Sequence, residues 1–330
     1  MIDNNAGYKT VSLVIPDQAA GERLDRYLGH MEGIELTRSK IQKLVEDGLV
    51  MVDNYPAGHN QKLKGGEIII INIPPTPVSD IRGEEIPLDI VYEDEYLIVV
   101  NKPAGMVTHP GAGNFSGTLV NAVLHHTERI SNVQGRERAG IVHRLDRNTS
   151  GLVMIARDDK THLALQKQLK ERRVEKTYLA IVCGHMKEET GIIDLPIGRS
   201  LKDRKKMAVT YQHSRPARTE YRLLERFRLY DFLEIKLETG RTHQIRVHFS
   251  HLGHPLLGDP EYGGRTKWHR GIYSADKIIA EKALAMIDRQ ALHAGTLGFT
   301  HPVTGKILKF NSPLPGDMAK LLDYLRTEGA

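Results

Sequence analysis

A proline-rich segment divides the chain into two parts and limits the folds that it can adopt. The segment PPTPVSDIRGEEIP, residues 74–87, holds four prolines in fourteen residues. Proline cannot continue a helix interior or a central strand, and proline-rich linkers are semi-rigid spacers. The chain of 330 residues is also long for one domain. We therefore predict a small domain over residues 1–75, a linker over 76–88 and a large domain over 89–330.

The small domain is predicted to be a compact α/β unit. An edge strand at 11–15 precedes helices at 22–30 and 37–48, and short strands follow at 49–52 and 67–73. Thr37 is a good N-cap for the second helix, which carries Arg38, Lys40 and Lys43. The pattern RLDRYL, TRSKIQKLVEDGLVMVDN and LKGGEIIII resembles the S4 RNA-binding module. The alternative from the residues alone is an accessory domain for dimerisation.

The large domain is predicted to be α+β with a substantially antiparallel sheet, because strands outnumber helices and short turns join most of them. The helix at 158–172 is amphipathic, with Leu163, Leu165 and Leu169 as its apolar members. No element is assigned to residues 265–281. Further helices are predicted at 118–126 and 242–251, and strands at 88–92, 96–101, 152–156, 176–182, 219–226, 232–237, 292–299 and 307–310.

Composition indicates a soluble cytosolic protein. The apolar fraction of 40% and the charged fraction of 26% are ordinary for a globular protein with a real core. No apolar segment reaches 18 residues, and the N-terminus MIDNNAGYKT lacks the features of a signal peptide. The single cysteine, Cys183, lies in the apolar run YLAIVCG, so we expect a buried thiol. No coiled-coil seam is present, and a monomer is the default expectation.

Positive charge is concentrated in the large domain. Residues 91–330 carry 37 Lys and Arg against 27 Asp and Glu, whereas residues 1–75 carry 8 against 10. Residues 199–228 alone hold 10 basic and 3 acidic side chains. Such a field favours a polyanionic partner, and nucleic acid is the first candidate. The alternative is a solvated basic face without a partner.

The stretch GIVHRLDRNTSGLVMIAR, residues 140–157, contains one carboxylate between two arginines. Asp146 stands between Arg144 and Arg147, and the apolar run 152–156 predicts a buried strand directly after it. Neighbouring positive charge lowers the pKa of a carboxylate, so Asp146 should be ionised. Such a group can act as a nucleophile or an orienting anion. A surface ion pair is the alternative reading of the same residues.

Motif spacing excludes several common chemistries. The chain has no GxGxxG between a strand and a helix, no GxxxxGK[ST] and no GxSxG. The histidines His243, His248, His251 and His254 match neither HExxH nor a zinc finger, and no cysteine pair accompanies them. We therefore expect no metal and no cofactor. Phosphate contact or core packing is the expected role for most of these histidines.

Polar residues in two later segments complement Asp146. Alternation along EKTYLAIV places Lys176 and Tyr178 on one face of a strand. TGRTHQIRVH places Arg241 and Arg246 around His243 and Gln244. An arginine can pair with Asp146 and orient it, while a tyrosine offers a face for stacking on a base and a phenol for proton transfer. This set suits a reaction that needs one nucleophile or acid–base pair and much positioning.

Six motifs in order resemble the RluA-type pseudouridine synthases. HRLDRNTSG at 143–151 matches the HRLDxxTSG signature of that family. NKPAGMVTHPGAG, KTY at 176–178, TGRTHQIRVH, HPLLGDPEYGG and DRQALHA are similar to its other motifs. The resemblance covers residues 90 to 315, and the S4-like unit narrows it to the branch that modifies bacterial large-subunit ribosomal RNA. It implies a pseudouridine-synthase-type large domain with a mostly antiparallel mixed sheet.

The resemblance implies a role for individual residues. Asp146 falls where the family has its catalytic aspartate, Tyr178 where it has its active-site tyrosine, and Arg246 where an arginine pairs with the aspartate. Arg144 matches a residue that, in a relative, enters the RNA helix where the target base leaves. The expected RNA-contacting residues are Arg144, His143, Lys176, Arg241, His243, Gln244, Arg38, Lys40, Lys43, Arg204, Lys205 and Lys206.

The implied reaction converts uridine to pseudouridine without a cofactor. The C1′–N1 bond breaks, the uracil turns and a C1′–C5 bond forms, with Asp146 acting through a glycal or by attack at C1′. The implied partner is ribosomal RNA in the precursor of the large (50S) subunit, and the implied target is the stem-loop known as helix 69 of 23S RNA. The alternatives are a pseudouridine synthase for transfer RNA and a non-catalytic RNA-binding or ribosome-assembly factor.

Overall fold

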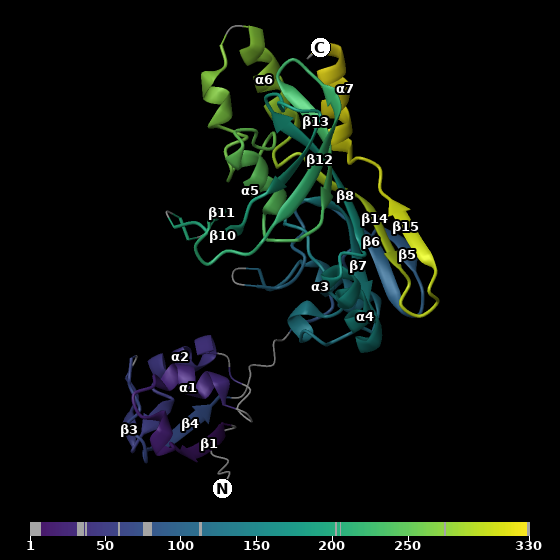
Figure 1. Cartoon of the computed structure of the whole chain (residues 1–330). Coiled ribbons are helices and arrows are strands. Elements are labelled where there is room, and N and C mark those ends of the chain that lie inside the picture. Colours follow the sequence, from purple (N-terminus) through teal and green to yellow (C-terminus); the bar gives the residue numbers. More distant parts are fainter. Residues whose placement is uncertain are drawn as a thin grey trace. The chain divides into compact units, whose positions relative to one another are not determined.

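The computed structural model describes residues 8–31, 36, 38–58, 60–74, 81–111, 114–201, 203–204, 206–273 and 275–328. The chain divides into two compact units, Met1–Asp80 and Ile81–Ala330, which are called the small unit and the large unit below (Figure 1). Within the described residues, no helix is long and apolar enough to cross a membrane. Each unit has its own hydrophobic core and is described by itself.

The small unit is a four-stranded antiparallel sheet packed on two helices. The strand order is β1-β4-β2-β3, so the predicted edge strand is confirmed. Ile69 and Ile71 of β4 are buried in the same cluster as Leu28 and Ile41 of the helices. Thr37, the predicted N-cap, lies outside the described residues. The elements are β1 (Lys9–Val14), η1 (Asp17–Ala19), α1 (Leu24–His30), α2 (Arg38–Glu46), β2 (Val50–Val52), β3 (Tyr55–Pro56) and β4 (Ile68–Ile73).

One large sheet organises the large unit, in the order β5-β6-β7-β14-β8-β13-β12-β9 (Figure 1). Among the described strands, β7 and β14 form the parallel pair and the other neighbours are antiparallel. The predicted α+β class with a mostly antiparallel mixed sheet is therefore confirmed. Its strands are β5 (Ile90–Glu93), β6 (Leu97–Lys102), β7 (Ser150–Ala156), β8 (Glu175–Cys183), β9 (Thr190–Asp194), β12 (Arg218–Arg226), β13 (Tyr230–Leu237), β14 (Leu292–Thr300) and β15 (Ile307–Asn311), which pairs with β14.

Strict alternation along β8 separates two hydrophobic cores. Tyr178 and Ala180 point into the cluster that also contains Ile245. Ile181 and Cys183 point into the cluster on the opposite face. Side chains that are two apart on a strand share a face, so this division follows from the sequence. Cys183 is fully buried, as expected. The face that holds Tyr178 is the one that carries the candidate site.

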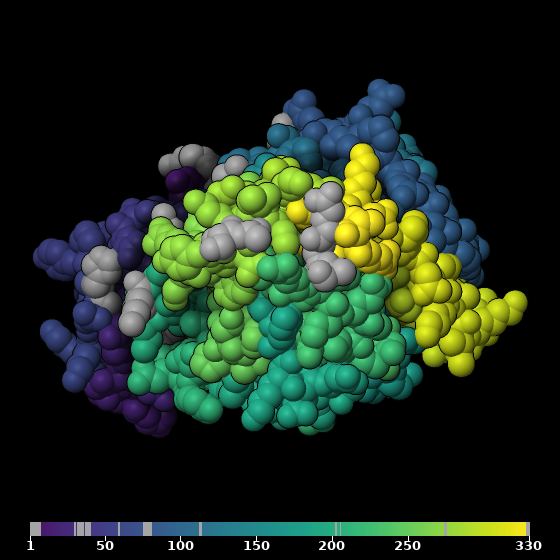
Figure 2. Space-filling view, turned by 90° about the horizontal axis from the view of Figure 1, so that it is seen from above, coloured from purple at the N-terminus to yellow at the C-terminus, as the bar shows by residue number. Residues whose placement is uncertain are grey.

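Helices cover both faces of the sheet. The helices predicted at 118–126, 158–172 and 242–251 are confirmed as α3 (Leu119–His126), α4 (Asp159–Lys170) and α5 (Gln244–His251). Two further helices, α6 (Ala275–Met286) and α7 (Gly316–Glu328), were not predicted. They pack in one cluster over β8 and β13, and Figure 2 shows their lime-green and yellow segments side by side. Short 3₁₀ helices are η2 (Arg136–Arg138) and η3 (Trp268–Gly271).

The two unpredicted helices differ in the signal that their sequences carry. In α6 the buried face includes the alanines Ala280 and Ala283, while Ile278 is 58% exposed, so apolar periodicity is weak. In α7, Met318, Leu321, Leu322 and Leu325 follow helical spacing and are all buried. The second helix was therefore predictable from the sequence, and the first was not.

The predicted apolar face of α4 needs a correction at Leu163, which is 55% exposed. Leu165 is fully buried, and Leu169 is partly buried against the same cluster. Two residues along a helix turn by about 200°, so Leu163 points away from the face that Leu165 occupies. Thr161 and His162 complete the buried face instead, one turn before Leu165.

Three short strands of the large unit were not predicted, and this unit begins within the predicted linker. β9 and the hairpin of β10 (Ile197–Arg199) with β11 (Met207–Val209) were not predicted. The hairpin packs through Ile197 on Val247 of α5, next to the candidate site. The large unit begins at Ile81, which is buried in its core, so residues 81–88 of the predicted linker pack with this unit.

Gly151 allows β7 to approach β14 closely. Its φ is 116°, and a Cβ at this position would lie 2.3 Å from the carbonyl oxygen of Ala294. Such contacts do not occur between real atoms, and this backbone conformation is rare for other residues. The parallel pairing of Gly151 with Ala294 brings the end of the loop that carries Asp146 beside β14.

We predict that Gly151→Ala lowers the free energy of unfolding of the large unit by roughly 3 kcal/mol or more, from backbone strain and the clash with Ala294. Gly305→Ala is the matched control, since Gly305 also has a positive φ of 69° but no atom near its Cβ position. That control should lose only about 1–2 kcal/mol. Urea unfolding measures both values, and equal losses would contradict the close approach.

Candidate active site

The loop before β7 carries Asp146 and is held at its backbone from three directions. Within the loop, the backbone N–H of Thr149 donates to the carbonyl of Asp146 at 3.1 Å. Other loop carbonyls accept hydrogen bonds from side chains far away in the sequence. These are Thr108 Oγ1 to Leu145 O at 2.7 Å, Lys102 Nζ to Arg147 O at 3.2 Å and Arg289 Nη1 to Asn148 O at 3.1 Å. Because these bonds fix the backbone, the carboxylate of Asp146 is presented in a defined position.

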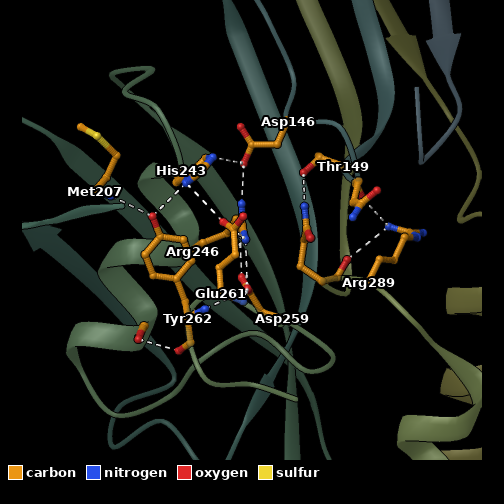
Figure 3. Close-up of polar contacts among 12 residues, drawn as sticks. Asp146, Thr149, Met207, His243, Arg246, Asp259, Glu261, Tyr262 and Arg289 are labelled. Atoms are coloured by element: carbon orange, nitrogen blue, oxygen red, sulfur yellow. Dashed lines mark hydrogen bonds and ion pairs between the residues drawn. The ribbon is translucent and has the colours of Figure 1, made fainter. Parts of the chain in front are cut away.

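Asp146 faces the guanidinium of Arg246 from α5, one hundred residues later (Figure 3). Arg246 Nη1 lies 3.3 Å from Asp146 Oδ2. The side chain of Asp146 is 17% exposed, whereas that of Arg246 is 5% exposed. The adjacent Arg147 turns elsewhere and donates through Nε to the carbonyl of Gly105 at 3.0 Å. The partner of Asp146 is therefore the distant arginine and not its neighbour in the sequence.

Arg246 binds three carboxylates at once (Figure 3). Its Nε donates to Asp259 Oδ2 at 2.7 Å, and its Nη2 donates to Asp259 Oδ1 at 3.0 Å and to Glu261 Oε2 at 2.8 Å. Burial lowers the pKa of Arg246, but the hydrogen bonds and charges of these carboxylates outweigh burial and raise it. The guanidinium is consequently a permanent cation beside Asp146.

Asp259 holds Arg246 in position through hydrogen bonds. It is completely buried, and its Oδ1 also accepts the backbone N–H groups of Glu261 and Tyr262 at 2.9 and 3.0 Å. A buried carboxylate that accepts several hydrogen bonds and a bidentate arginine is fully satisfied. The ring of Tyr262 lies under Arg246, with the guanidinium carbon 4.8 Å from the ring centroid. Asp259 thus orients both Arg246 and the segment that carries Tyr262.

His243 lies beside Asp146 at the start of α5. Its Nε2 is 3.8 Å from Asp146 Oδ2, and its Nδ1 is 2.8 Å from the hydroxyl of Tyr262. The residue was predicted to contact RNA, and the structure places it against the candidate catalytic carboxylate. Its backbone has φ 57° at the start of α5, a left-handed conformation that aims the ring back at the site.

Two adjoining cavities meet at Asp146. One has a volume of about 90 Å³ and includes Tyr178, Leu237 and Leu292 in its wall. The other, of about 380 Å³, includes polar residues such as Asn148 and Gln290. Both are also lined by Arg144, Leu145, Asp146, His243 and Arg246. A mostly apolar hollow beside a polar one, with a carboxylate at their junction, can bind a flat ring and a sugar-phosphate chain respectively.

Tyr178 is buried in the wall of the smaller cavity and lies on β8 opposite Ala294 of β14. Burial, followed by the charge of Asp146, raises the pKa of its phenol well above the usual range. The hydroxyl therefore remains protonated at neutral pH. The sequence prediction that Tyr178 joins Asp146 and Arg246 in one place agrees with this geometry.

Two lysines near the site have depressed pKa values. Burial lowers the pKa of Lys102 to about 7, against an opposing effect of Asp146. Its Nζ still contacts three carbonyls, those of Pro103, Met106 and Arg147, which the three hydrogens of an ammonium satisfy. Burial and the charge of Arg241 lower the pKa of Lys176 to about 8. Lys176 is half-buried on β8 on the same face as Tyr178, as predicted.

Two residues predicted to contact RNA have structural roles instead. Gln244 is 2% exposed, and all four hydrogen-bonding positions of its amide are used within the protein. The Nε2 of His143 accepts the backbone N–H of Met154 at 3.1 Å, and burial lowers the pKa of its ring to about 3. His143 is half-buried, and a neutral ring whose Nε2 already accepts from the backbone is not placed to bind a phosphate. Both predictions are corrected on these grounds.

The remaining predicted RNA contacts are placed as follows. Arg144 is exposed and lines both cavities, and Arg241 lines the smaller one. Arg204 is exposed between β10 and β11, while Lys206 donates through Nζ to the carbonyl of Glu261 at 3.0 Å. Lys43 is exposed on α2. Lys205 and the side chains of Arg38 and Lys40 lie outside the described residues.

The basic segment at residues 199–228 has fewer side chains available for binding phosphate than its composition indicates. Four of its arginines form ion pairs within the protein: Arg218 with Glu238, Arg222 with Glu234, Arg226 with Asp231, and Arg228 with Asp276. An arginine that already binds a carboxylate contributes less to a phosphate-binding surface. The local excess of basic residues in the sequence therefore overstates the charge available to RNA.

The histidines in and around α5 have different roles: His248 and His254 make contacts within the fold, whereas His243 lies at the candidate site. His248 is fully buried, with its two ring nitrogens at 2.9 Å from Thr219 Oγ1 and from the carbonyl of Leu195. His254 Nδ1 contacts the carbonyl of Cys183 at 3.1 Å. In the described part of the chain, no group of three or more His, Cys, Asp or Glu side chains is arranged to hold a metal ion.

Five residues at the site were not predicted from the sequence: Asp259, Glu261, Tyr262, Lys102 and Arg289. Each lies in a motif that was noted, namely GDPEYGG, NKPAG and DRQALHA, but no role was assigned to it. The available signal was a charged residue inside a short apolar segment, as in PLLGDP around Asp259. A charge in such a segment indicates a buried partner, because unpaired buried charges are costly.

Comparison with known proteins places the chain among enzymes of RNA modification. The family described as RNA pseudouridylate synthase matches residues 96–251, and the S4 domain family matches residues 22–69. Ribosomal large subunit pseudouridine synthase D of Nitrosomonas europaea is 46% identical over 318 residues, covering 96% of this chain and 88% of that protein. An uncharacterized RNA pseudouridine synthase of Bacillus subtilis is 42% identical over 319 residues, covering 97% and 99%.

A solved structure agrees with these sequence relatives. Human RNA Pseudouridylate Synthase Domain Containing 1 is 26% identical, with a TM-score of 0.52, and the match covers 74% of this chain and 97% of that one. The chain therefore belongs to the RluA-type family of RNA pseudouridine synthases and carries an S4 domain before the synthase domain. The resemblance seen in the motifs and the enzyme class that it implied are confirmed.

We predict that Asp259→Asn lowers the free energy of unfolding by about 3–5 kcal/mol, because it removes one charge from a buried ion pair. Glu261→Gln is the matched comparison, since the Glu261 side chain is 48% exposed and makes one contact with Arg246. It should change stability by less than about 1 kcal/mol. Urea unfolding separates the two, and equal losses would contradict the anchoring role of Asp259.

We also predict that His143 makes the free energy of unfolding depend on pH under acidic conditions. Its pKa is about 3 in the folded protein and about 6.5 in an unfolded chain. Between these values the unfolded state binds one more proton, so stability falls as the pH falls, by about 1.4 kcal/mol per pH unit. His143→Gln keeps an acceptor for Met154 N–H and should reduce that slope by up to this amount. An unchanged slope in urea unfolding at several pH values would exclude a neutral His143 ring with a depressed pKa.

Proposed function

We propose that this enzyme converts specific uridines of large-subunit (23S) ribosomal RNA to pseudouridine, with Asp146 as its catalytic carboxylate. The observation that carries the proposal is the Asp146–Arg246 pair at the junction of two cavities, beside buried Tyr178. Relatives named ribosomal large subunit pseudouridine synthase D share 40–46% identity over nearly the whole chain, which supports the ribosomal target. The stem-loop helix 69 is the proposed site of modification.

In this proposal the target uridine leaves its helix before reaction. A base inside a helix exposes neither its glycosidic bond nor its C5 atom, so the enzyme must accommodate an extruded nucleotide. The uracil would lie in the smaller cavity against Tyr178, Leu237 and Leu292, and the larger polar cavity would hold the sugar and its phosphates. Arg144, exposed at the rim of both cavities, is the proposed side chain that fills the vacated position.

Asp146 would act on the ribose while Arg246 orients it. The C1′–N1 bond breaks with its electrons passing to the uracil, the ring turns, and C5 forms the new bond to C1′. Asp146 either removes and returns the C2′ proton through a glycal or bonds transiently to C1′. In both routes the proton of C5 is lost and N1 ends protonated, so the product is an isomer of the substrate. The protonated phenol of Tyr178 packs on the ring and is a candidate for proton transfer.

The S4 domain supports binding to folded RNA in the precursor of the large (50S) subunit. The S4 match at residues 22–69 supports an RNA-positioning role for the small unit, with Lys43 exposed on its second helix. Recognition of structured RNA depends mainly on shape and phosphate contacts. In this proposal the enzyme acts in the cytoplasm, as a monomer and without a cofactor.

The proposed chemistry predicts that Asp146→Asn abolishes pseudouridine formation, by about 10³-fold or more in single-turnover rate. The amide keeps the size of the side chain and loses its charge and basicity. Asp323→Asn is the control, because Asp323 is 75% exposed on α7. Purified enzyme and transcribed 23S RNA fragments are assayed for pseudouridine. Conversion by Asp146→Asn at the wild-type rate would refute the assignment.

The target is tested by mapping pseudouridine in ribosomal and transfer RNA from a strain that lacks the protein. Sites lost from helix 69 and restored by the wild-type gene support the ribosomal target, whereas losses confined to transfer RNA would overturn it. Complementation with the Asp146→Asn gene tests the alternative of a non-catalytic RNA-binding or ribosome-assembly factor. If that gene restores growth without restoring pseudouridine, the protein has an assembly role that does not need catalysis.

A further inference from the structure

We propose that His243 is a positioning residue for Asp146, held by Tyr262 in the one neutral form whose Nε2–H faces the carboxylate. The inference rests on the proposed function, because it assumes that Asp146 does the chemistry. It assigns His243 a role other than RNA contact, and it gives the hydroxyl of Tyr262 a function. Three side chains and one backbone N–H form the chain of contacts from Met207 to Asp146 (Figure 3).

The contacts of the Tyr262 hydroxyl favour donation to His243. Glu261 Oε2 also lies 3.7 Å from Nδ1 of His243, which is longer than a hydrogen bond. Its oxygen accepts the backbone N–H of Met207 at 3.1 Å, and it lies 2.8 Å from Nδ1 of His243. If Nδ1 carried a hydrogen, the hydroxyl oxygen would face two donors, and the described residues offer no third contact to take its own hydrogen. The arrangement that satisfies every group has Tyr262 donating to Nδ1. The neutral ring of His243 then carries its hydrogen on Nε2.

That hydrogen points toward Asp146. Nε2 of His243 lies 3.8 Å from Asp146 Oδ2, which is an electrostatic contact longer than a hydrogen bond. Catalytic contacts are often long in free enzymes and shorten when substrate binds. Nη1 of Arg246 approaches the same oxygen at 3.3 Å. Within the described residues, Arg246 and His243 both approach Oδ2 of the carboxylate, so Oδ1 is the oxygen left for the ribose.

The electrostatics around His243 favour the neutral ring. Burial lowers its pKa, Asp146 raises it, Arg246 lowers it, and Glu261 and Asp259 raise it, with a lowered pKa as the net result. A second proton on the ring would also place Nδ1–H against the hydroxyl of Tyr262. A neutral donor orients Asp146 without neutralising it, whereas an imidazolium would compete with the substrate for its charge.

The β10–β11 hairpin takes part in this chain of contacts. Met207 belongs to β11, and its neighbour Lys206 donates to the carbonyl of Glu261, next to Tyr262. A shift of the hairpin would withdraw the N–H of Met207 and free the Tyr262 hydroxyl oxygen to accept from either side. The proton position on His243 is therefore coupled to the position of the hairpin.

Two variants test the proposal in single-turnover reactions at saturating RNA. His243→Asn suits the left-handed backbone and keeps a polar group near the Nδ1 position, but it lacks the distal donor. The rate should fall about 10–100-fold, as expected when a reacting group is misplaced by about 1 Å. RNA affinity should change by less than about twofold. His243→Gln, whose amide nitrogen reaches the Nε2 position, should recover part of the rate.

Tyr262→Phe keeps the ring beneath Arg246 and removes the hydroxyl. The ring of His243 then protonates more readily, so its pKa rises and the acidic limb of the pH–rate profile should move to higher pH. His185→Asn and Tyr273→Phe are the controls, since both residues are exposed and neither lines the two cavities. Thermal unfolding of each variant identifies any loss of fold. If His243→Asn does not fold, the conservative Tyr262→Phe still tests the proposal.

The outcomes separate this inference from the proposed function. A wild-type single-turnover rate in His243→Asn, or a loss confined to RNA affinity, overturns the positioning role. An unshifted acidic limb in Tyr262→Phe overturns the part played by its hydroxyl. Either result together with inactive Asp146→Asn leaves the proposed function standing. Full activity of Asp146→Asn would instead remove the basis of both.

Discussion

The buried guanidinium of Arg246 is the interaction on which the site depends. It binds Asp146 from the loop before β7, and Asp259 and Glu261 from the segment after α5. Removing a charge from water costs several kcal/mol unless good geometry compensates for it, so Arg246 requires these partners in fixed positions. In return, it holds together segments that are one hundred residues apart and presents one carboxylate to the cavities. The residues that position Asp146 and those that stabilise this region are therefore largely the same.

The sheet supplies the framework for this pair. Gly151 permits the parallel contact between β7 and β14, which places the Asp146 loop next to the strand that pairs with Tyr178. Arg289, itself 4% exposed and paired with Asp317 of α7, donates to the carbonyl of Asn148 in that loop. The C-terminal helix thus supports the loop that carries Asp146 through one buried arginine. The site built from residues 146, 178 and 246 is therefore linked to α7 through Arg289.

The sequence predicted the strands and the fold class well, and the site only in part. Alternation and apolar runs identified β7, β8 and β14 because their side chains obey a local rule. Arg246 as the partner of Asp146 came from the family motif, since no local pattern joins residues so far apart. Asp259 and Tyr262 were missed because their roles depend on burial beside Arg246. Gln244 was misassigned for the same reason: its four hydrogen bonds appear only in the folded chain.

The most direct test of this account is the single-turnover rate of Arg246→Lys on its RNA substrate, measured together with RNA affinity. A lysine keeps the positive charge but cannot bind Asp259 through two parallel hydrogen bonds while also reaching Asp146 and Glu261. The account predicts a rate lower by about 10²-fold, with affinity changed by less than about twofold. A rate within about twofold of wild type would show that charge alone suffices and would contradict the central role of this geometry.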